Sequence, residues 1–169
     1  SILRAIEEDD SDDGLGEESV SPQLNTIHIK HKSFKMKDNK SIRLCCDSGA
    51  SNLFVDNPEY LSNKRKTRPM RTKTGGRNAK IYTEIQGDVY LQSNVPNSTK
   101  VIKATNAMHS PNVSGNYLSI SQFDKSGCSM KQKGGKMMIV KDQETLLRAK
   151  LSKNNLHYAT CECLKVSKT

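Results

Sequence analysis

The sequence predicts an all-β domain with one short helix, and three observations support that fold class. Apolar and polar residues alternate in several segments, most clearly in residues 81–91, as they do in strands with one buried face. Segments rich in Gly, Pro, Asn and Ser separate these strands. Apolar residues make up 34% of the 169 residues against 27% charged, and there is no Trp. Such a lean composition suits a small β-rich domain, or one that completes its core by self-association.

The clearest strands lie in the first two thirds of the chain. Residues 27–29 and 42–46 each alternate, with a turn expected between them at residues 37–40. A long strand, bent at Gly87, is predicted from the residues that share one face of the next run: Ile81, Thr83, Ile85, Gly87, Val89 and Leu91. Asp88 falls on the other, polar face, where we expect it to be solvated.

Turns and a helix complete the pattern. Residues 74–78, with adjacent glycines, are expected to form a hairpin tip, and residues 95–98 another turn before a strand that opens at Val101. One helix is expected over residues 117–125, because Tyr117, Ile120 and Phe123 are three apart and Gly127 follows as a terminator. After Cys128 we expect extra C-terminal β-hairpins, with strands at 137–141, 146–151 and 156–160 and turns at 134–135 and 152–155.

The charge is distributed unevenly. Residues 1–20 hold eight acids against Arg4 alone, a net charge of −7. The other 149 residues carry a net charge of +16, which gives the whole chain its net charge of +9. The acidic segment suggests a disordered linker, and the basic remainder suggests attraction to polyanions. Surplus lysine that only solubilises the surface is the alternative, because no RNA-binding motif or aromatic stacking platform accompanies the charge. No stretch reaches the roughly 18 apolar residues of a membrane helix, so no membrane partner is expected.

Cysteine spacing argues against a structural metal or a disulfide framework. The five cysteines occur as Cys45-Cys46, Cys128 and Cys161-x-Cys163, without the paired spacing of zinc sites and with one left over from any pairing. No secretory signal is expected at the first residues, so reduced thiols in a cytosolic-type compartment are predicted. The four histidines are scattered, Gly134-Gly135-Lys136 lacks the flanking residues of a phosphate loop, and no G-x-S-x-G occurs. No metal or other cofactor is expected.

A candidate catalytic acid follows the apolar strand at 42–46, in the sequence Asp47-Ser48-Gly49-Ala50. An acidic residue at the end of an apolar strand is lifted out of bulk water, as catalytic acids often are. Ser48 offers a hydroxyl to fix it, and Gly49 lets another backbone or a substrate approach closely. These features suit aspartic-protease chemistry, in which two carboxylates share one proton. The structural alternative is a turn that Asp47 caps with its own side chain.

Three longer segments resemble one family, the protease region of copia-type (Ty1/copia) retrotransposon polyproteins. They are DSGASNLFVDNPEYL at 47–61, the Gly-rich hairpin with its long strand, and SPNVSGNYLSISQFDKSGC at 110–128. The tail at 134–159 is similar to the leader that precedes integrase in those polyproteins. The resemblance covers roughly residues 27–159 and is specific through the combination of motifs.

The resemblance implies a retropepsin-like closed β-barrel whose active site forms in a homodimer, with one Asp47 from each subunit. Ser48 would make hydrogen bonds across the subunits, Gly49 would lie beneath the substrate, and Ala50 would complete the loop. The flap would carry Thr74, Gly75, Gly76 and Arg77, and Gly115, Asn116 and Leu118 would support the loop from behind.

The same resemblance implies an aspartic endopeptidase that cleaves its own Gag-Pol polyprotein. Its domains would be an acidic linker at 1–24, the protease at 25–130 and a pre-integrase leader at 131–169. It would work in cytoplasmic virus-like particles, with the nucleus as a second compartment. Cys45 and Cys46 depart from the family's large apolar residues, and the flap segment is unusually basic.

Two alternatives remain open. A catalytically silent barrel could serve in particle assembly or in weak RNA contact through the basic surface. A regulatory protease of the ubiquitin pathway is disfavoured, because no extra recognition domain is evident.

Overall fold

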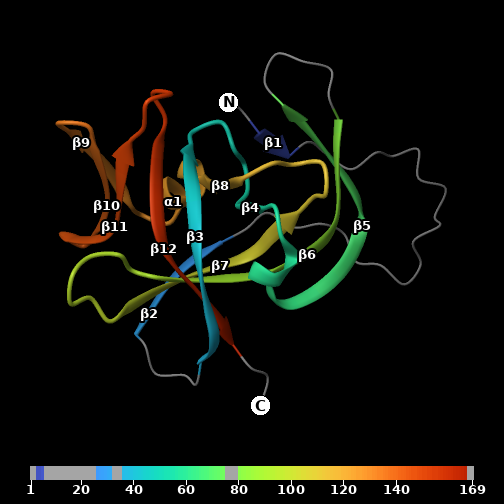
Figure 1. The fold of residues 1–169 in the computed structure, drawn as a ribbon, viewed down its shortest axis with the longest axis horizontal. Helices are drawn as coiled ribbons and strands as arrows, with labels where there is room; N and C mark the ends of the chain where they lie inside the picture. The colour runs from blue at the N-terminus through green and yellow to red at the C-terminus, as the bar shows by residue number, and fades with distance from the viewer. Residues whose placement is uncertain (1–2, 6–25, 32–35, 75–79, 167–169) are drawn as a thin grey trace.

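The computed structural model describes residues 3–5, 26–31, 36–74 and 80–166, and this part of the chain is all-β with one short α-helix (Figure 1). The predicted fold class is therefore confirmed. The elements, in chain order, are β1 (Leu3–Ala5), β2 (Ile27–His31), β3 (Met36–Asp47), β4 (Phe54–Val55), the 3₁₀ turn η1 (Pro58–Tyr60), β5 (Ser62–Thr74), β6 (Lys80–Gln92), β7 (Lys100–His109), β8 (Asn116–Ser119), α1 (Ile120–Lys125), β9 (Ser129–Lys133), β10 (Lys136–Lys141), β11 (Glu144–Leu151) and β12 (His157–Val166).

Six of these strands form a closed ring in the order β6, β7, β4, β8, β3, β12. The ring closes because β12 pairs with β3 over most of its length and then with β6, at Cys163↔Leu91 and Leu164↔Tyr90. Two of the pairings are parallel, β3 with β8 and β4 with β7. Closure of this kind removes the exposed edges that an open sheet would present.

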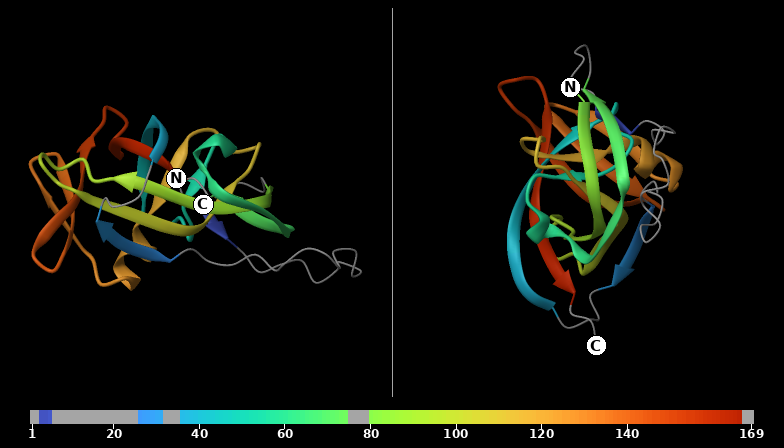
Figure 2. Two further views of the ribbon diagram at one scale, coloured as in Figure 1. Left: turned by 90° about the horizontal axis from the view of Figure 1, so that it is seen from below. Right: turned by 90° about the vertical axis from the view of Figure 1, so that its right-hand side faces the viewer.

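The other strands extend this ring outward. β5 pairs with β6 as a long hairpin, β1 adds to β5, and β2 adds to β7. Beyond β12, the same sheet continues through β11, β10 and β9, and this part lies at the opposite end of the molecule from the end of the hairpin where β5 leads into β6 (Figure 1 and the left view of Figure 2). The C-terminal hairpins therefore pack on the barrel, and β12 is one of its strands.

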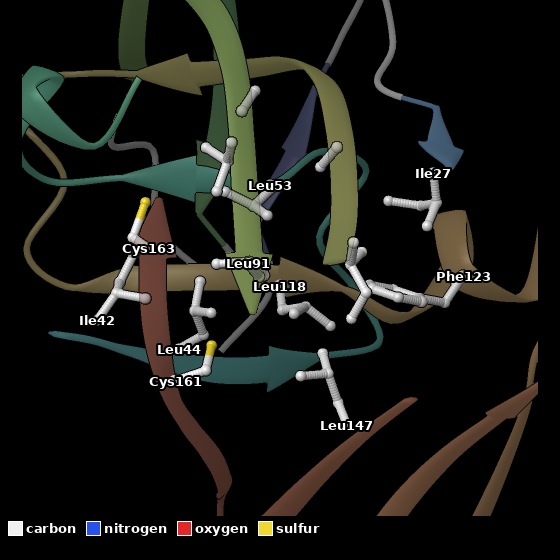
Figure 3. Close-up of a cluster of buried hydrophobic side chains, with 14 of the residues drawn as sticks. Ile27, Ile42, Leu44, Leu53, Leu91, Leu118, Phe123, Leu147, Cys161 and Cys163 are labelled. Atoms are coloured by element: carbon white, nitrogen blue, oxygen red, sulfur yellow. The ribbon is translucent and has the colours of Figure 1, made fainter. Parts of the chain in front are cut away.

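The core lies inside the ring. Leu44, Leu53, Leu91 and Leu118 are at most 1% exposed and meet Cys161 and Cys163 from β12 (Figure 3). On β12, Ala159, Cys161 and Cys163 are buried while Thr160 and Glu162 are exposed, the period-two pattern of a strand with one face inward. Each fully buried leucine contributes about 2 kcal/mol through removal of apolar surface from water.

Three local predictions are corrected by long-range contacts. The turn expected at 37–40 is wrong, since β3 runs straight through it and β12 supplies its hydrogen bonds, with Cys163 opposite Lys40. The helix expected from Tyr117 begins at Ile120, because Asn116–Ser119 pair in parallel with the end of β3. Asp88 is not solvated: it is 8% exposed and accepts a hydrogen bond from Asn63 Nδ2 at 3.2 Å.

The long strand predicted over residues 81–91 is confirmed as β6, and its ladder to β7 shifts register between Gly87 and Val89. The hairpin is confirmed to the extent that β5 and β6 pair as far as Lys73↔Lys80, while residues 75–79 of the expected tip lie outside the described residues. Of the expected acidic linker, Leu3–Ala5 are described, and they pair with β5. No helix in the described part of the chain has the length and apolar character needed to span a bilayer.

Candidate active site

Asp47 is the last residue of β3, where the strand leaves the barrel. The three residues before it, Leu44, Cys45 and Cys46, are buried, and Asp47 itself is only 5% exposed. On the neighbouring strand β8 it lies opposite Ser119. The strand thus carries a carboxyl group into an environment with little water, as its position after an apolar run predicted.

The two oxygens of the Asp47 carboxyl group have different surroundings. Oδ1 accepts a hydrogen bond from the Gly49 N–H at 2.8 Å, and the Ala50 N–H donates to the Asp47 carbonyl at 3.3 Å. These bonds form the Asp-capped turn that was the structural alternative. Oδ2 is buried and has no hydrogen-bond partner among the described residues. A buried carboxyl oxygen without a partner is costly, and such atoms occur where a ligand or a second chain completes the site.

Side chains from the start of α1 hold the turn after Asp47. Ser119 Oγ donates to the Ala50 carbonyl at 2.6 Å, Ser121 Oγ reaches the same oxygen at 3.3 Å, and Gln122 Nε2 donates to the Ser51 carbonyl at 2.9 Å. Ser119 is also the N-cap of α1, accepting from the Gln122 N–H at 3.3 Å. One cluster of hydrogen bonds therefore fixes both the turn and the helix.

The three residues predicted to support the turn make different contacts. Asn116 bridges two segments, since its Oδ1 accepts from the Asp56 N–H at 2.9 Å and its Nδ2 donates to the Arg43 carbonyl at 3.3 Å. Leu118 is fully buried in the barrel core. Gly115 has φ +91°, a conformation that glycine adopts readily, and it turns the chain into β8.

Sequence reasoning missed Ser119, Ser121 and Gln122 as the residues that hold the turn. The signal was present as Ser119-x-x-Gln122, the spacing of a capping box in which a serine N-cap precedes Gln by three residues. That pattern marks the helix start at Ile120. It does not show that the same serine reaches a carbonyl 69 residues away.

The groups next to Asp47 stay neutral near pH 7. Cys45 on β3 is paired with Tyr117 on β8. Burial, with a smaller contribution from the Asp47 carboxylate, raises the pKa of the Cys45 thiol, and burial also raises the pKa of the Tyr117 hydroxyl. Burial raises the pKa of Cys46 to about 12. Thiols with raised pKa values are poor nucleophiles, so Asp47 is the group in this cluster suited to catalysis.

The remaining predicted site residues are only partly described. Ser48 is exposed and Gly49 half-buried, and the Ser48 hydroxyl has no hydrogen-bond partner within the described residues. Thr74 ends β5, whereas Gly75, Gly76 and Arg77 lie outside the described residues. Among the residues that are described, no group of three or more His, Cys, Asp or Glu is placed to hold a metal ion.

A recess of about 270 Å³ opens beside the base of the β5–β6 hairpin. It is lined by Glu84, Ile85, His109, Pro111 and Asn112, from β6, the end of β7 and the loop before β8. His109 Nδ1 lies 3.1 Å from the Val55 carbonyl, a hydrogen bond that fixes the ring. The recess is large enough for one side chain of a bound peptide.

The fold and this site define a class, a closed β-barrel with a buried acid at a strand exit. A family model described as the β-barrel domain of Pol polyproteins matches residues 44–128, half of the chain. The chain therefore belongs to this family, which supports the expected origin in a retroelement polyprotein. The match includes the Asp47 turn, the β5–β6 hairpin and α1. No curated protein and no solved structure matches the chain significantly.

Proposed function

We propose that this chain is the aspartic endopeptidase of a copia-like retroelement, a retropepsin-like barrel that cleaves its own Gag-Pol polyprotein as a homodimer in cytoplasmic particles. The observation that carries the proposal is the Asp47 carboxyl group, buried at a strand exit with Oδ1 fixed by Gly49 and Oδ2 unpartnered. Membership of the Pol β-barrel family supports it.

The chemistry needs two carboxyl groups, and the sequence holds a single Asp-Ser-Gly motif, at residues 47–49. Two copies of Asp47 sharing a proton would act together on a peptide bond. The ionised carboxylate takes a proton from water, and the oxygen of that water bonds to the carbonyl carbon. The other carboxyl group gives its proton to the carbonyl oxygen. The intermediate then collapses as the carbon–nitrogen bond breaks and the leaving nitrogen takes up a proton.

Three further features fit a peptide substrate. The exposed hydroxyl of Ser48 is available for a hydrogen bond to a second subunit. The recess beside Ile85 and His109 would accept a substrate side chain, and the β5–β6 hairpin would cover the peptide.

The direct test compares cleavage of a Gag-Pol precursor by the wild-type chain and by Asp47→Asn. The amide cannot take the proton from water, so we expect no cleavage above background. Asp124→Asn, which removes an exposed carboxylate from α1, is the matched control and should cleave normally. Cleavage by Asp47→Asn at the wild-type rate would refute the proposal.

A mixing experiment tests whether two chains share one site. If each active site takes one Asp47 from each subunit, a dimer with one Asp47→Asn chain is inactive. An equal mixture after subunit exchange should keep about one quarter of the activity of the undiluted wild-type chain. Retention of half would mean that each chain carries its own site. Sedimentation of both proteins reports whether they dimerise equally.

A further inference from the structure

Five cations gather on the outer face of the β9–β10–β11 sheet. Residues directly opposite in an antiparallel pair share a face. Lys133 lies opposite Lys136, which lies opposite Lys150, so three lysines form a row across three strands. Two residues further along β10, Met138 lies between Lys131 on β9 and Arg148 on β11, which are its partners on either side. We call these five exposed residues the basic face: Lys131, Lys133, Lys136, Arg148 and Lys150.

These charges are not neutralised within the described protein. None of the five forms an ion pair with a carboxylate of the described residues. The sequence between residues 125 and 141 contains no Asp or Glu, and neither does that between 145 and 161. Like charges directly opposite each other destabilise a sheet. A row of three lysines is therefore a feature that the fold does not need, and it suits an anionic partner.

An aromatic side chain continues the row. Lys150 lies opposite Tyr158 on β12, which is half-buried, and the Arg43 guanidinium carbon lies 3.6 Å from the centre of its ring. Tyr158 Oη accepts a hydrogen bond from Asn154 Nδ2 at 2.9 Å, which orients the ring. A tyrosine stacked with an arginine is a platform for a nucleobase, because bases stack on aromatic rings and on guanidinium planes.

We propose that the basic face binds single-stranded nucleic acid, with its lysines and arginines on the phosphates and a base at Tyr158 and Arg43. Strands are about 4.8 Å apart and alternate residues about 6.7 Å apart along a strand, so the cations form a regularly spaced array. An extended single strand has unpaired bases, so one of them can reach the platform at Tyr158 while its phosphates meet the cations, whereas the bases of a duplex stay stacked inside it. An acidic peptide offers carboxylates without bases, and would leave the platform at Tyr158 unused.

The basic face and the proposed protease site approach each other at one point, since Tyr158 lies opposite Cys45, two residues before Asp47. The strands β9, β10 and β11 and the end of the hairpin where β5 leads into β6 lie at opposite ends of the molecule (Figure 1 and the left view of Figure 2). Nucleic acid bound to the basic face would therefore leave the hairpin free. The inference does not rest on the proposed protease function, because binding of nucleic acid is measured without any cleavage and either proposal can fail alone.

The test measures binding of a labelled 20-nucleotide oligouridylate to the full chain over a range of salt concentrations. For single strands the slope of log K against log salt is roughly −0.7 per phosphate contact. The triple variant Lys133→Gln, Lys136→Gln and Lys150→Gln should bind at least tenfold more weakly at low salt, with a slope smaller by about 2. A control with the same loss of charge, Lys30→Gln, Lys66→Gln and Lys125→Gln, changes exposed lysines on β2, β5 and α1. It should keep most of the affinity.

The base platform has its own test. Tyr158→Leu should weaken oligouridylate binding about tenfold without changing the salt slope, and Tyr158→Phe should bind normally. Circular dichroism and the melting temperature establish that each variant is folded. If the two triple variants weakened oligouridylate binding equally, the proposal would be refuted, since the affinity would then depend on the net charge of the protein and not on the basic face. Binding of a 20-residue polyglutamate as tight as that of oligouridylate would also refute it, and would indicate an acidic protein as the partner.

Discussion

Ser119 shows how one side chain joins two parts of the candidate site. Its hydroxyl donates to the carbonyl of Ala50 and accepts from the backbone of Gln122, so it ties the turn after Asp47 to the first turn of α1. The residue is 1% exposed, and water cannot replace it without a rearrangement. The position of Asp47 therefore depends on a residue distant in sequence and adjacent across the parallel pair of β3 and β8.

We predict that Ser119→Ala lowers the free energy of unfolding by about 2 kcal/mol, because it removes an N-cap and leaves a buried carbonyl with only the longer contact to Ser121. Urea denaturation measures this change. Ser121→Ala is the control: its hydroxyl is half-buried and 3.3 Å from the Ala50 oxygen, so the loss should stay below about 1 kcal/mol. Equal losses in the two variants would contradict the assigned role of Ser119.

The residues of the site differ in how far the sequence predicts them. Asp47 and its turn follow from local sequence, since the Gly49 N–H that binds Oδ1 is two residues away. The bonds from Ser119 and Gln122 to the turn span 69 and 71 residues, and no local pattern encodes such partners. Whether a second Asp47 meets the first depends on another chain, so this stays a prediction.

Among the strands, β6 packs closely against the start of β5 at one glycine, Gly87. A Cβ atom at Gly87 would lie 2.8 Å from the Ser62 carbonyl oxygen and 3.0 Å from Leu61 Cβ. The ladder between β6 and β7 shifts register at the same point. The contact lies where β5 begins, so Gly87 lets the β5–β6 hairpin pack closely onto the barrel.

We predict that Gly87→Ala lowers the free energy of unfolding by about 2 kcal/mol, because the backbone of β5 must move to admit the methyl group. Thermal and urea unfolding measure the effect. The control Gly134→Asn places a side chain in open space at φ +58°, which asparagine tolerates, so its effect should be below about 0.5 kcal/mol. A wild-type melting temperature for Gly87→Ala would show that the close approach is absent in solution.

The lysine row across β9, β10 and β11 gives a second prediction for an element. Lys136→Glu replaces two like-charged pairs with two opposite-charged pairs and should raise the free energy of unfolding by about 1 kcal/mol at low salt. In 1 M salt the gain should largely disappear, because exposed charges are screened. Lys66→Glu, where the opposite residue on β6 is Ile85, should give no such salt-dependent gain. A gain that persists at high salt would point to a cause other than charge.

The elements themselves show what alternation in a sequence can predict. β6, β10 and β11 were predicted within a few residues, because each has a clear apolar pattern with turn residues at its ends. In the first half of β3 the sequence predicts a turn, because Lys37-Asp38-Asn39-Lys40 is polar and favours turns. Pairing with β12 overrides that local preference, and only the folded chain brings the partner strand to it.

For the molecule as a whole, β12 is the strand that closes the ring. It contributes Cys161 and Cys163 to the core and joins β3 to β6. The sequence predicted a strand at 156–160 but not that it continues to Val166 and closes the ring. That outcome depends on pairs such as Cys163↔Leu91, which are separated by 72 residues. Strand patterns indicate which segments pair, but seldom with which partner.

The buried thiols predict how stability depends on alkaline pH. Burial raises the pKa of Cys46, Cys161 and Cys163 from the ordinary 9.0 to about 12. Above pH 9 these thiols ionise in the unfolded chain but stay protonated in the folded one, so the unfolded state binds fewer protons. The stability that burial of neutral thiols provides is complete below pH 9 and is lost as pH rises toward 12. Each thiol should lower the free energy of unfolding by up to about 1.4 kcal/mol per pH unit in that interval.

Urea denaturation of the reduced protein between pH 8 and 11 measures this dependence. Other groups also titrate there, so the informative quantity is the difference between the wild-type chain and Cys163→Ala. The alanine variant is less stable at pH 8 because it leaves a small cavity in the core. Its disadvantage should shrink as pH rises, since it has one fewer thiol to ionise on unfolding. A difference that stays constant from pH 8 to 11 would mean that Cys163 titrates alike in both states, and that β12 does not close the barrel over it.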